Sequence, residues 1–412
     1  MAEQHEKALV PQIRFTGFTD PWEQRKLGDI TVELSEYATQ ELGLPLLTSS
    51  RSGLMYQDEY RDSRTTKSTE TLFSVVPVGT CTYRHMSDDD VFHMNINTLE
   101  KGLVSREYPV FEASKGNNLE FLVQHINSSE EFKAFCAEQK KGGTRTRLYY
   151  NTLCQFTVRV PALREQAQIS QCLKKLDTLI TLHQRKYEKL VNIKKSMLDK
   201  MFPQNGASVP EIRFKGFTDP WEQRKLGDAF ERVVRKNTNN ESRLPLTISA
   251  QDGLVDQITY FNNRVASRDV SNYYLVYNGE FAYNKSTSDG YPFGAVKRLD
   301  WYEKGVLSTL YIVFALKHPE KDDSDFMTVF YDTDRWHRGV AERAAEGARN
   351  HGLLNISADD FFDIDTTMPE DKVEQEKIGR LLKKLDTLIT LHQRKLEKLQ
   401  NIKKSCLEKM FV

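Results

Sequence analysis

The sequence predicts an α+β protein in which two similar globular α/β domains alternate with two long helices. A stretch near the start, residues 10–29, recurs as residues 209–228 with 18 of 20 positions identical. A second stretch, residues 173–202, recurs as residues 382–411 with 26 of 30 positions identical. Self-similarity at a fixed spacing indicates a duplicated structural unit. The chain of 412 residues is therefore interpreted as a tandem repeat.

The matched ends place four segments along the chain. We expect a first globular domain at residues 1–160, a first helix at 161–203, a second domain at 204–365 and a second helix at 366–412. Pro203 and the polar stretch QNGAS that follows it are typical of a helix end and a linker.

Between the matching ends, the two copies share mainly apolar, glycine and turn-forming positions, the residue types that fix a scaffold. The shared positions include Leu44, Pro45, Leu46, Ser49, Gly53, Leu54, Gln57 and Tyr60, which return as Leu244, Pro245, Leu246, Ser249, Gly253, Leu254, Gln257 and Tyr260. The differing positions are mostly polar, which favours two binding surfaces with different targets. Ordinary drift after duplication is the alternative, although drift would have altered the ends as well.

The end of each copy has the pattern of a coiled-coil helix. Apolar or histidine residues recur at alternating steps of four and three, with charged residues between them and no internal proline. The first seam is Ile169, Leu173, Leu176, Ile180, His183, Tyr187 and Leu190, and the second is Ile378, Leu382, Leu385, Ile389, His392, Leu396 and Leu399. Beyond Leu190 the stripe drifts to Ile193, Met197 and Met201.

The two seams predict that the helices pair with each other inside one chain. We expect helices at about residues 165–202 and 374–411, antiparallel and related by a pseudo-two-fold axis. His183 and His392 lie near the two midpoints, so they are predicted to approach each other there. A polar seam layer that fixes the register is the favoured interpretation, and a pH switch or a metal pair is the alternative.

Composition limits the class of protein. The 58 basic and 58 acidic residues cancel, but the two helical segments hold 20 basic against 9 acidic residues, so the remainder is net acidic. The five cysteines form no CxxC pair, which indicates reduced thiols in a cytosolic protein. No signal-peptide pattern and no run of 18 apolar residues occurs, so we expect a cytoplasmic location without a membrane partner.

Two motifs carry a specific resemblance. RFxGFTDPWEQRKLGD opens each copy, and LKKLDTLITLHQRKxEKLxNIKKSxLxKMF, preceded by Glu165-Gln166 or Glu374-Gln375, closes it. Over nearly its whole length the chain resembles the specificity subunit of type I restriction–modification enzymes. The resemblance implies two target-recognition domains that each read one half of a split, asymmetric site in double-stranded DNA. It also implies that the helices set the spacing and dock two methyltransferase subunits, which restriction subunits then join.

The resemblance implies a chain without catalysis, whose partners carry S-adenosylmethionine, ATP and magnesium. In agreement, the sequence has no GxxxxGK[ST] loop, no GxGxxG turn and no Asn/Asp-Pro-Pro-aromatic loop for methyl transfer. We interpret the acidic runs Asp88-Asp89-Asp90 and Asp322-Asp323 with Asp325 as solvated loops, because two-metal chemistry needs carboxylates from separate elements.

Candidate DNA contacts are basic or amide residues near glycines and aromatics, which can reach bases or phosphates. In the first domain they are Arg84, His85, Lys140, Lys141, Arg145, Arg147 and Tyr149. In the second domain they are Asn284, Lys285, Ser286, Tyr291, Arg335, Arg338, Arg343, Arg349 and Asn350. An exposed turn without a ligand, or a solvated helix face, remains the alternative for each group.

Two other functions are compatible with parts of the pattern. A coiled-coil adaptor could use its globular domains to bind protein or RNA, and it would show no preference for a DNA sequence. A self-contained methyltransferase or nuclease would show turnover as the purified chain alone.

Overall fold

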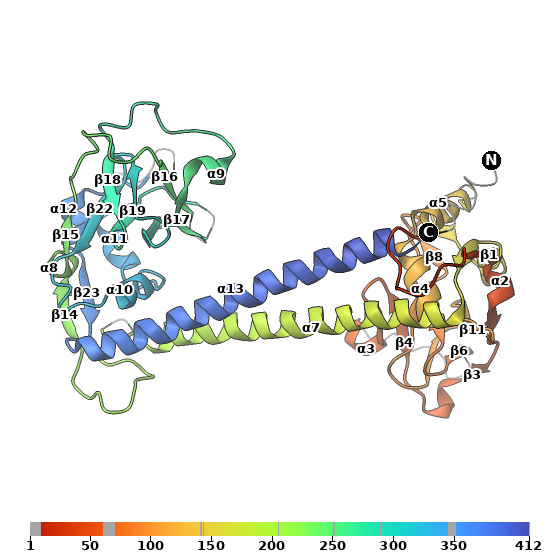
Figure 1. The fold of residues 1–412 in the computed structure, drawn as a ribbon. Helices are drawn as coiled ribbons and strands as arrows, with labels where there is room; N and C mark the ends of the chain where they lie inside the picture. The colour runs from red at the N-terminus through yellow and green to blue at the C-terminus, as the bar shows by residue number, and fades with distance from the viewer. Residues whose placement is uncertain are drawn as a thin grey trace. The chain divides into compact units, whose positions relative to one another are not determined.

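The computed structural model describes residues 10–60, 71–140, 142, 144–204, 206–249, 252–288, 290–344 and 352–411. The chain forms two compact units: Met1–His183 with Arg394–Val412 (unit 1), and Gln184–Gln393 (unit 2). Each unit holds one globular domain together with parts of both long helices (Figure 1).

The domain of unit 1 is assembled from short antiparallel strands. Its largest sheet has the order β2 (Thr31–Glu33), β11 (Val110–Ala113), β7 (Cys81–Thr82) and β9 (Asn95–Ile96). A second sheet has the order β10 (Gly102–Ser105), β6 (Phe73–Val76) and β3 (Tyr37–Ala38). The strand pairs are β1 (Glu23–Lys26) with β13 (Thr157–Val160), β4 (Leu47–Ser50) with β5 (Gly53–Tyr56), and β8 (Met86–Ser87) with β12 (Thr146–Arg147).

Short helices complete this domain. They are α2 (Leu27–Ile30), the 3-10 helix η1 (Gln40–Leu42), α3 (Gln57–Tyr60), α4 (Leu119–Ser128), α5 (Glu130–Glu138) and α6 (Tyr150–Leu153). Asn118 caps α4 and Ser129 caps α5, each through a side-chain oxygen that accepts a backbone N–H of the first turn.

The domain of unit 2 repeats the largest sheet of unit 1 and three of its strand pairings. Its four-stranded sheet has the order β15 (Phe230–Arg232), β22 (Ile312–Leu316), β19 (Phe281–Asn284) and β20 (Ala295–Arg298). The pairs are β14 (Glu222–Lys225) with β23 (Asp365–Met368), β16 (Leu246–Ser249) with β17 (Gly253–Asp256), and β18 (Tyr274–Tyr277) with β21 (Lys304–Leu307). The short helices are α8 (Leu226–Ala229), α9 (Gln257–Phe261), α10 (Ser324–Phe330), α11 (His337–Ala344) and α12 (Ala358–Phe362).

The pairing of the first two strands of the four-stranded sheet repeats in register as well. Phe111 lies opposite Glu33 in unit 1, as Phe314 lies opposite Arg232 in unit 2. The two domains therefore share a scaffold, in agreement with the apolar and turn-forming positions that the two copies have in common. The domain boundary expected at residue 365 falls on the first residue of β23, so the strand that closes the second domain continues to Met368.

The long helices are α7 (Leu163–Lys200) and α13 (Lys372–Lys409), each of 38 residues (Figure 1, yellow-green and blue). Each begins and ends two residues earlier than the sequence indicated. All 14 predicted seam residues are buried or half-buried. By contrast, Leu179, Leu182 and Leu391, outside the seam, are 41%, 45% and 44% exposed. The heptad pattern thus identified the inward face.

Ion pairs within each unit establish that the helices are antiparallel. In unit 1, Asp177 in the first half of α7 pairs with Lys403 near the end of α13 at 2.5 Å. In unit 2, Lys194 near the end of α7 pairs with Asp386 in the first half of α13 at 2.6 Å. His183 belongs to unit 1 and His392 to unit 2, so their approach stays a prediction.

The ends of the long helices are part of the globular cores. The start of α7 and the end of α13 join the core of unit 1, which contains Trp22 and Phe121. The start of α13 and the end of α7 join the core of unit 2, which contains Trp221 and Phe326. The drift of the stripe beyond Leu190 follows from this, because the last turns of α7 face the globular domain rather than the other helix.

The Glu-Gln pair that opens each helix motif has a structural role. The Gln166 side chain accepts a hydrogen bond from the backbone N–H of Asn118 at 2.9 Å and donates one to the carbonyl of Pro161 at 2.8 Å. Gln375 makes the equivalent two bonds in unit 2, both at 2.8 Å. Each long helix is therefore fixed to the domain that precedes it. None of the described helices is both long and apolar enough to cross a bilayer.

Candidate nucleic-acid interface

Two of the predicted stretches in unit 1 lie side by side. Strand β8 pairs with β12, so that Met86 lies opposite Arg147 and Ser87 opposite Thr146. This pairing brings the loop that begins at Arg84 next to the KKGGTRTR stretch, although about 60 residues separate them in sequence. The two candidate sites in the first domain therefore form one surface.

The acidic run in this surface is exposed at Asp88 and Asp89, as expected of a solvated loop, and each of its carboxylates holds one basic side chain. Asp88 pairs with Arg145 at 2.7 Å, Asp90 with Lys140 at 3.5 Å, and Asp89 with Arg51. These pairs are largely exposed, so each contributes little to folding stability. Their main effect is to fix where the basic groups lie.

Asp89 is the best held of the three. Besides Arg51, it accepts a hydrogen bond from the Ser87 hydroxyl at 2.9 Å and one from the backbone N–H of Val91 at 3.4 Å. The bond from Arg51, followed by the one from Ser87, lowers the pKa of Asp89 to about 2. The carboxylate is therefore ionised throughout the physiological range.

His85 is not on the surface as predicted. Its side chain is buried, and its ring stacks on Tyr149 at 5.7 Å between centroids with 27° between the planes. Burial lowers the pKa of His85, so the ring is neutral at pH 7. His85 thus supports Tyr149, which is 47% exposed. Arg84 and Arg147 are exposed, and Lys141 lies outside the described residues.

The corresponding loop of unit 2 uses its polar groups differently. The Lys285 ammonium donates to the carbonyl of Ile356 at 3.3 Å, and the Asn284 side chain accepts the N–H of Ser286 at 3.0 Å. Asn284, Lys285 and Tyr291 are half-buried, whereas Ser286 is exposed. Contacts within unit 2 therefore engage the side chains of Asn284 and Lys285.

Two of the arginines predicted for unit 2 fasten helix α11 within the unit. Arg335 donates to the carbonyl of Asp199 at 3.0 Å, and Arg343 donates to the carbonyl and carboxylate of Asp363 at 2.6 and 2.9 Å. Both side chains are largely covered, whereas the Arg338 side chain is 75% exposed. Arg338 is thus the better placed of the three for an external ligand, and Arg349 and Asn350 lie outside the described residues.

The second acidic run, by contrast, is not a solvated loop. Asp322 is 2% exposed and pairs with Arg224. Asp323 caps helix α10, and Asp325 pairs with Arg298 at 2.8 Å. These carboxylates hold the scaffold of unit 2. Among the described residues, no group of three His, Cys, Asp or Glu side chains could hold a metal ion.

Sequence reasoning missed two exposed features. Arg51 lies at the tip of the β4–β5 hairpin, beside the surface formed by β8 and β12. On α9 of unit 2, Tyr260 and Phe261 are 48% and 50% exposed and contact each other edge to face at 4.9 Å. Little signal for Arg51 was present in the sequence, because position 51 is one of seven positions that differ between the copies within residues 47–56.

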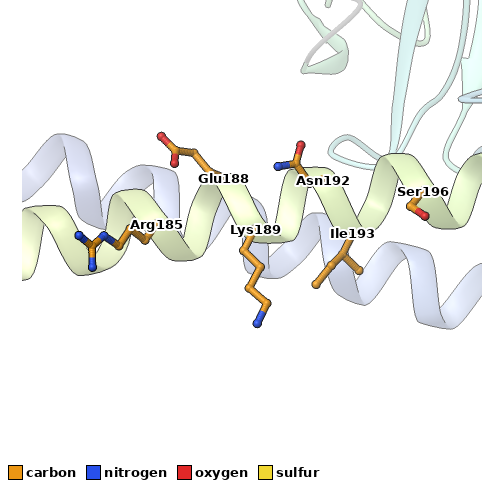
Figure 2. A pocket seen from close by; sticks show the side chains of 6 residues that line it. All are labelled: Arg185, Glu188, Lys189, Asn192, Ile193 and Ser196. Atoms are coloured by element: carbon orange, nitrogen blue, oxygen red, sulfur yellow. The ribbon is translucent and has the colours of Figure 1, made fainter. Parts of the chain in front are cut away.

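A shallow depression of about 470 Å³ lies on α7 within unit 2. It is lined by Arg185, Glu188, Lys189, Asn192, Ile193 and Ser196, all from this one helix. Figure 2 shows Glu188 and Asn192 projecting to one side of the helix and Lys189 and Ile193 to the other. The polar groups do not converge, so the depression has no arrangement that would hold a small cofactor.

Comparison with known proteins agrees with this geometry. Residues 93–192 match the family model described as the type I restriction modification DNA specificity domain. The S subunit of a type I restriction-modification system from M. genitalium has a TM-score of 0.59 and 12% identity, covering 98% of this chain and 99% of that one. The HsdS subunit from Thermoanaerobacter tengcongensis has a TM-score of 0.42 and 13% identity, covering 95% and 96%.

The resemblance to type I specificity subunits is confirmed. The fold of the M. genitalium subunit extends over nearly the whole of this chain. The match to the DNA specificity domain begins just before β9 and continues into α7, so it includes Lys140, Arg145, Arg147 and Tyr149. It does not identify which side chains contact DNA.

Proposed function

We propose that this chain is the DNA-reading subunit of a type I restriction–modification complex and that each globular domain reads one half of a bipartite, asymmetric site. The observation that carries the proposal is a scaffold whose four-stranded sheet and three strand pairings recur in both units, with different polar side chains in equivalent loops. Arg84 and His85 of the first domain, for example, correspond to Asn284 and Lys285 of the second. A shared frame with altered polar groups is what two readers of different base sequences require.

The helices are proposed to set the distance between the half-sites and to dock two methyltransferase subunits. At about 1.5 Å per residue, a helix of 38 residues is about 57 Å long. The helical segments carry a net positive charge, with 20 basic against 9 acidic residues, and Leu179, Leu182 and Leu391 are apolar groups exposed outside the seam. Such residues suit a protein interface. Restriction subunits would join this core, and S-adenosylmethionine, ATP and magnesium would bind to the partners.

The decisive experiment is methylome sequencing of a host that expresses the chain with its methyltransferase partner. We expect adenine methylation at one motif of two short specific parts separated by a fixed gap. The absence of any motif that depends on the chain would overturn the proposal. A gel shift on random duplex with the methyltransferase present distinguishes a DNA-reading subunit from a coiled-coil adaptor, because the adaptor would show no sequence preference. Methylation or cleavage by the purified chain alone would contradict a non-catalytic role.

A chimera tests directly whether each globular domain recognises its own half-site. Residues 30–160 would replace residues 229–368, between the shared head motif and the start of α13. Because the helices run antiparallel, two copies of one reader should recognise an inverted repeat of the first half-site. The reciprocal chimera, with residues 229–368 in both places, should recognise an inverted repeat of the second half-site. A chimera that still methylates the original asymmetric site would contradict the assignment of one half-site to each domain.

A further inference from the structure

The tip of the β4–β5 hairpin is rigid. Ser50 lies opposite Gly53, so only Arg51 and Ser52 form the turn. The Ser50 hydroxyl donates to the carbonyl of Gly53 at 3.0 Å and accepts the N–H of Ser52 at 3.1 Å. Gly53 has φ of +128°, which an L side chain rarely adopts. The backbone that carries Arg51 is therefore held in one conformation.

The hairpin is also fastened to the sheet beneath it. Buried Asn95 on β9 donates to the Ser49 hydroxyl and to the carbonyl of Ser50, both at 2.7 Å. The tip borders a groove of about 440 Å³ in unit 1. Its lining includes Arg51, Arg84, Ser87, Asp89 and Val91.

The Arg51 side chain is exposed yet oriented. It is 62% exposed, and its Nη2 atom donates to Asp89, which Ser87 and Val91 hold in place. A guanidinium has five N–H donors in a planar fork, and the contact with Asp89 engages one of its nitrogen atoms. The contact with Asp89 already restricts the rotamers of the Arg51 side chain. Less conformational entropy is therefore lost when Arg51 binds a ligand.

The second copy has a hairpin at the equivalent place, with a different register. Ser49, Gly53 and Leu54 recur in sequence as Ser249, Gly253 and Leu254, but Ser249 lies opposite Gly253 whereas Ser49 lies opposite Leu54. Position 51, however, corresponds to Gln251. Arginine pairs in bidentate fashion with guanine and glutamine with adenine in the major groove. All three residues between the shared serine and glycine differ in sequence, as Ser50, Arg51 and Ser52 against Ala250, Gln251 and Asp252, and arginine at position 51 is the side chain suited to guanine.

We propose that Arg51 reads a guanine in the half-site of unit 1 and that Asp89 is the positioning residue that orients its guanidinium. The inference rests on the proposed function, because it assumes that unit 1 faces a DNA half-site. A phosphate contact by Arg51 is a different outcome, since it would contribute the same affinity to every sequence.

The test uses the complete chain assembled with its methyltransferase partner, and a pool of randomised duplexes whose bound fraction is sequenced. In R51A we expect the preference for guanine to fall by about 5- to 150-fold at one position of one half-site, with all other positions unchanged. R51Q, which places the side chain of the second copy on this hairpin, should move the preference at that position toward adenine. D89N should weaken the preference at the same position by a smaller factor.

The matched control is R25A. Arg25 on β1 is also an exposed arginine in an ion pair, with Glu23 at 3.5 Å, and it lies outside the groove. R25A should leave every position of the motif unchanged. Thermal unfolding of all variants should match the parent, because the altered side chains are exposed.

Three results would overturn the inference. Unchanged base preferences in R51A, or weaker binding by an equal factor for every sequence, would exclude base reading by Arg51. A D89N effect at a different position would exclude the positioning role. If the unaltered complex selects a motif, these results count against Arg51 alone, whereas a complex that selects no motif removes the proposed function as well.

Discussion

Arg14 and Glu165 form a bidentate ion pair that joins the motif at the start of the first copy, residues 14–29, to the first turn of α7. The Nε and Nη2 atoms of Arg14 donate to the two carboxylate oxygens at 2.7 and 2.8 Å, and Glu165 is 1% exposed. Arg213 and Glu374 repeat both distances in unit 2. The motif that opens each copy is therefore fixed to the start of the long helix of the same copy through a glutamate that both copies share.

We expect E165Q to destabilise unit 1 strongly. The substitution leaves the Arg14 guanidinium, which is largely covered, without its counter-charge, and breaking a buried pair in this way costs about 3–5 kcal/mol. Calorimetric unfolding of the chain should show a lower Tm. E23Q is the control, because the pair of Glu23 with Arg25 is exposed and is worth at most about 1 kcal/mol. Equal Tm shifts for the two variants would contradict a structural role for the joint.

His125 makes the stability of unit 1 depend on pH. It is 5% exposed, it stacks on Phe411 at 4.9 Å, and its Nδ1 atom has no hydrogen-bond partner among the described residues. Burial lowers the pKa of His125 to about 4. The unfolded chain binds this proton below about pH 6.5, whereas the folded chain does not until pH 4. The contribution of His125 to the free energy of unfolding should therefore be constant above about pH 6.5. As the pH drops to 4, the free energy of unfolding should fall by up to about 3 kcal/mol.

Unit 2 provides the control for this pH effect. Phe330 on α10 occupies the position that His125 has on α4, and it contacts Phe202 as His125 contacts Phe411. H125F should therefore fit the site and remove the His125 part of the pH dependence. Urea unfolding of the parent and of H125F at pH 7, 6, 5 and 4 measures the difference between them. A constant difference across this range would show that His125 does not titrate as its burial implies.

The features that the sequence predicted best are the local and repeated ones. The heptad seam located the inward face of both helices, since a periodic apolar pattern within one element determines which face is buried. The short strands could not be placed in this way, because segments of two to four residues pair with partners far along the chain.

The candidate contact residues were harder to predict for the same reason. His85 is buried by Tyr149, and Arg343 is engaged by Asp363, contacts that only the folded chain brings together. Residue type alone indicated a DNA contact for both. Arg51 was missed because its position at a turn, and not its sequence neighbourhood, makes it prominent.

Gly379 gives a third prediction, on how α13 packs in unit 2. A Cβ atom at this position would lie 2.6 Å from the backbone nitrogen of Phe326, closer than such atoms approach. The first copy has Ser170 at the equivalent position, where its hydroxyl bonds to the carbonyl of Ala167 at 3.1 Å. We expect G379S to destabilise the chain by about 1–3 kcal/mol, because α13 must move away from α10.

The reciprocal variant S170G is the control for Gly379. It introduces no overlap, so its cost should be limited to the lower helix propensity of glycine, at most about 1 kcal/mol. Chemical denaturation of both variants measures the two costs. A G379S variant as stable as S170G would mean that the helices of unit 2 tolerate a wider separation than the structure has.

The last prediction concerns the KKGGTRTR stretch. Arg145 and Arg147 are exposed beside β8, and Arg145 is held by Asp88 at 2.7 Å. If this surface faces DNA, the double variant R145A/R147A should bind duplex more weakly while still assembling with the methyltransferase partner. Loss of two phosphate contacts would also reduce the slope of log affinity against log salt by about 2.

The control for that variant is K133A on α5, which removes an exposed cation paired with Glu130 at 2.6 Å on another element of the same domain. Its affinity and salt slope should equal those of the parent. Fluorescence anisotropy at several salt concentrations measures both quantities, and co-purification measures assembly. Unchanged affinity in R145A/R147A would remove this loop from the DNA interface. Weaker binding with an unchanged slope would instead indicate base contacts, because contacts to base edges release few counterions.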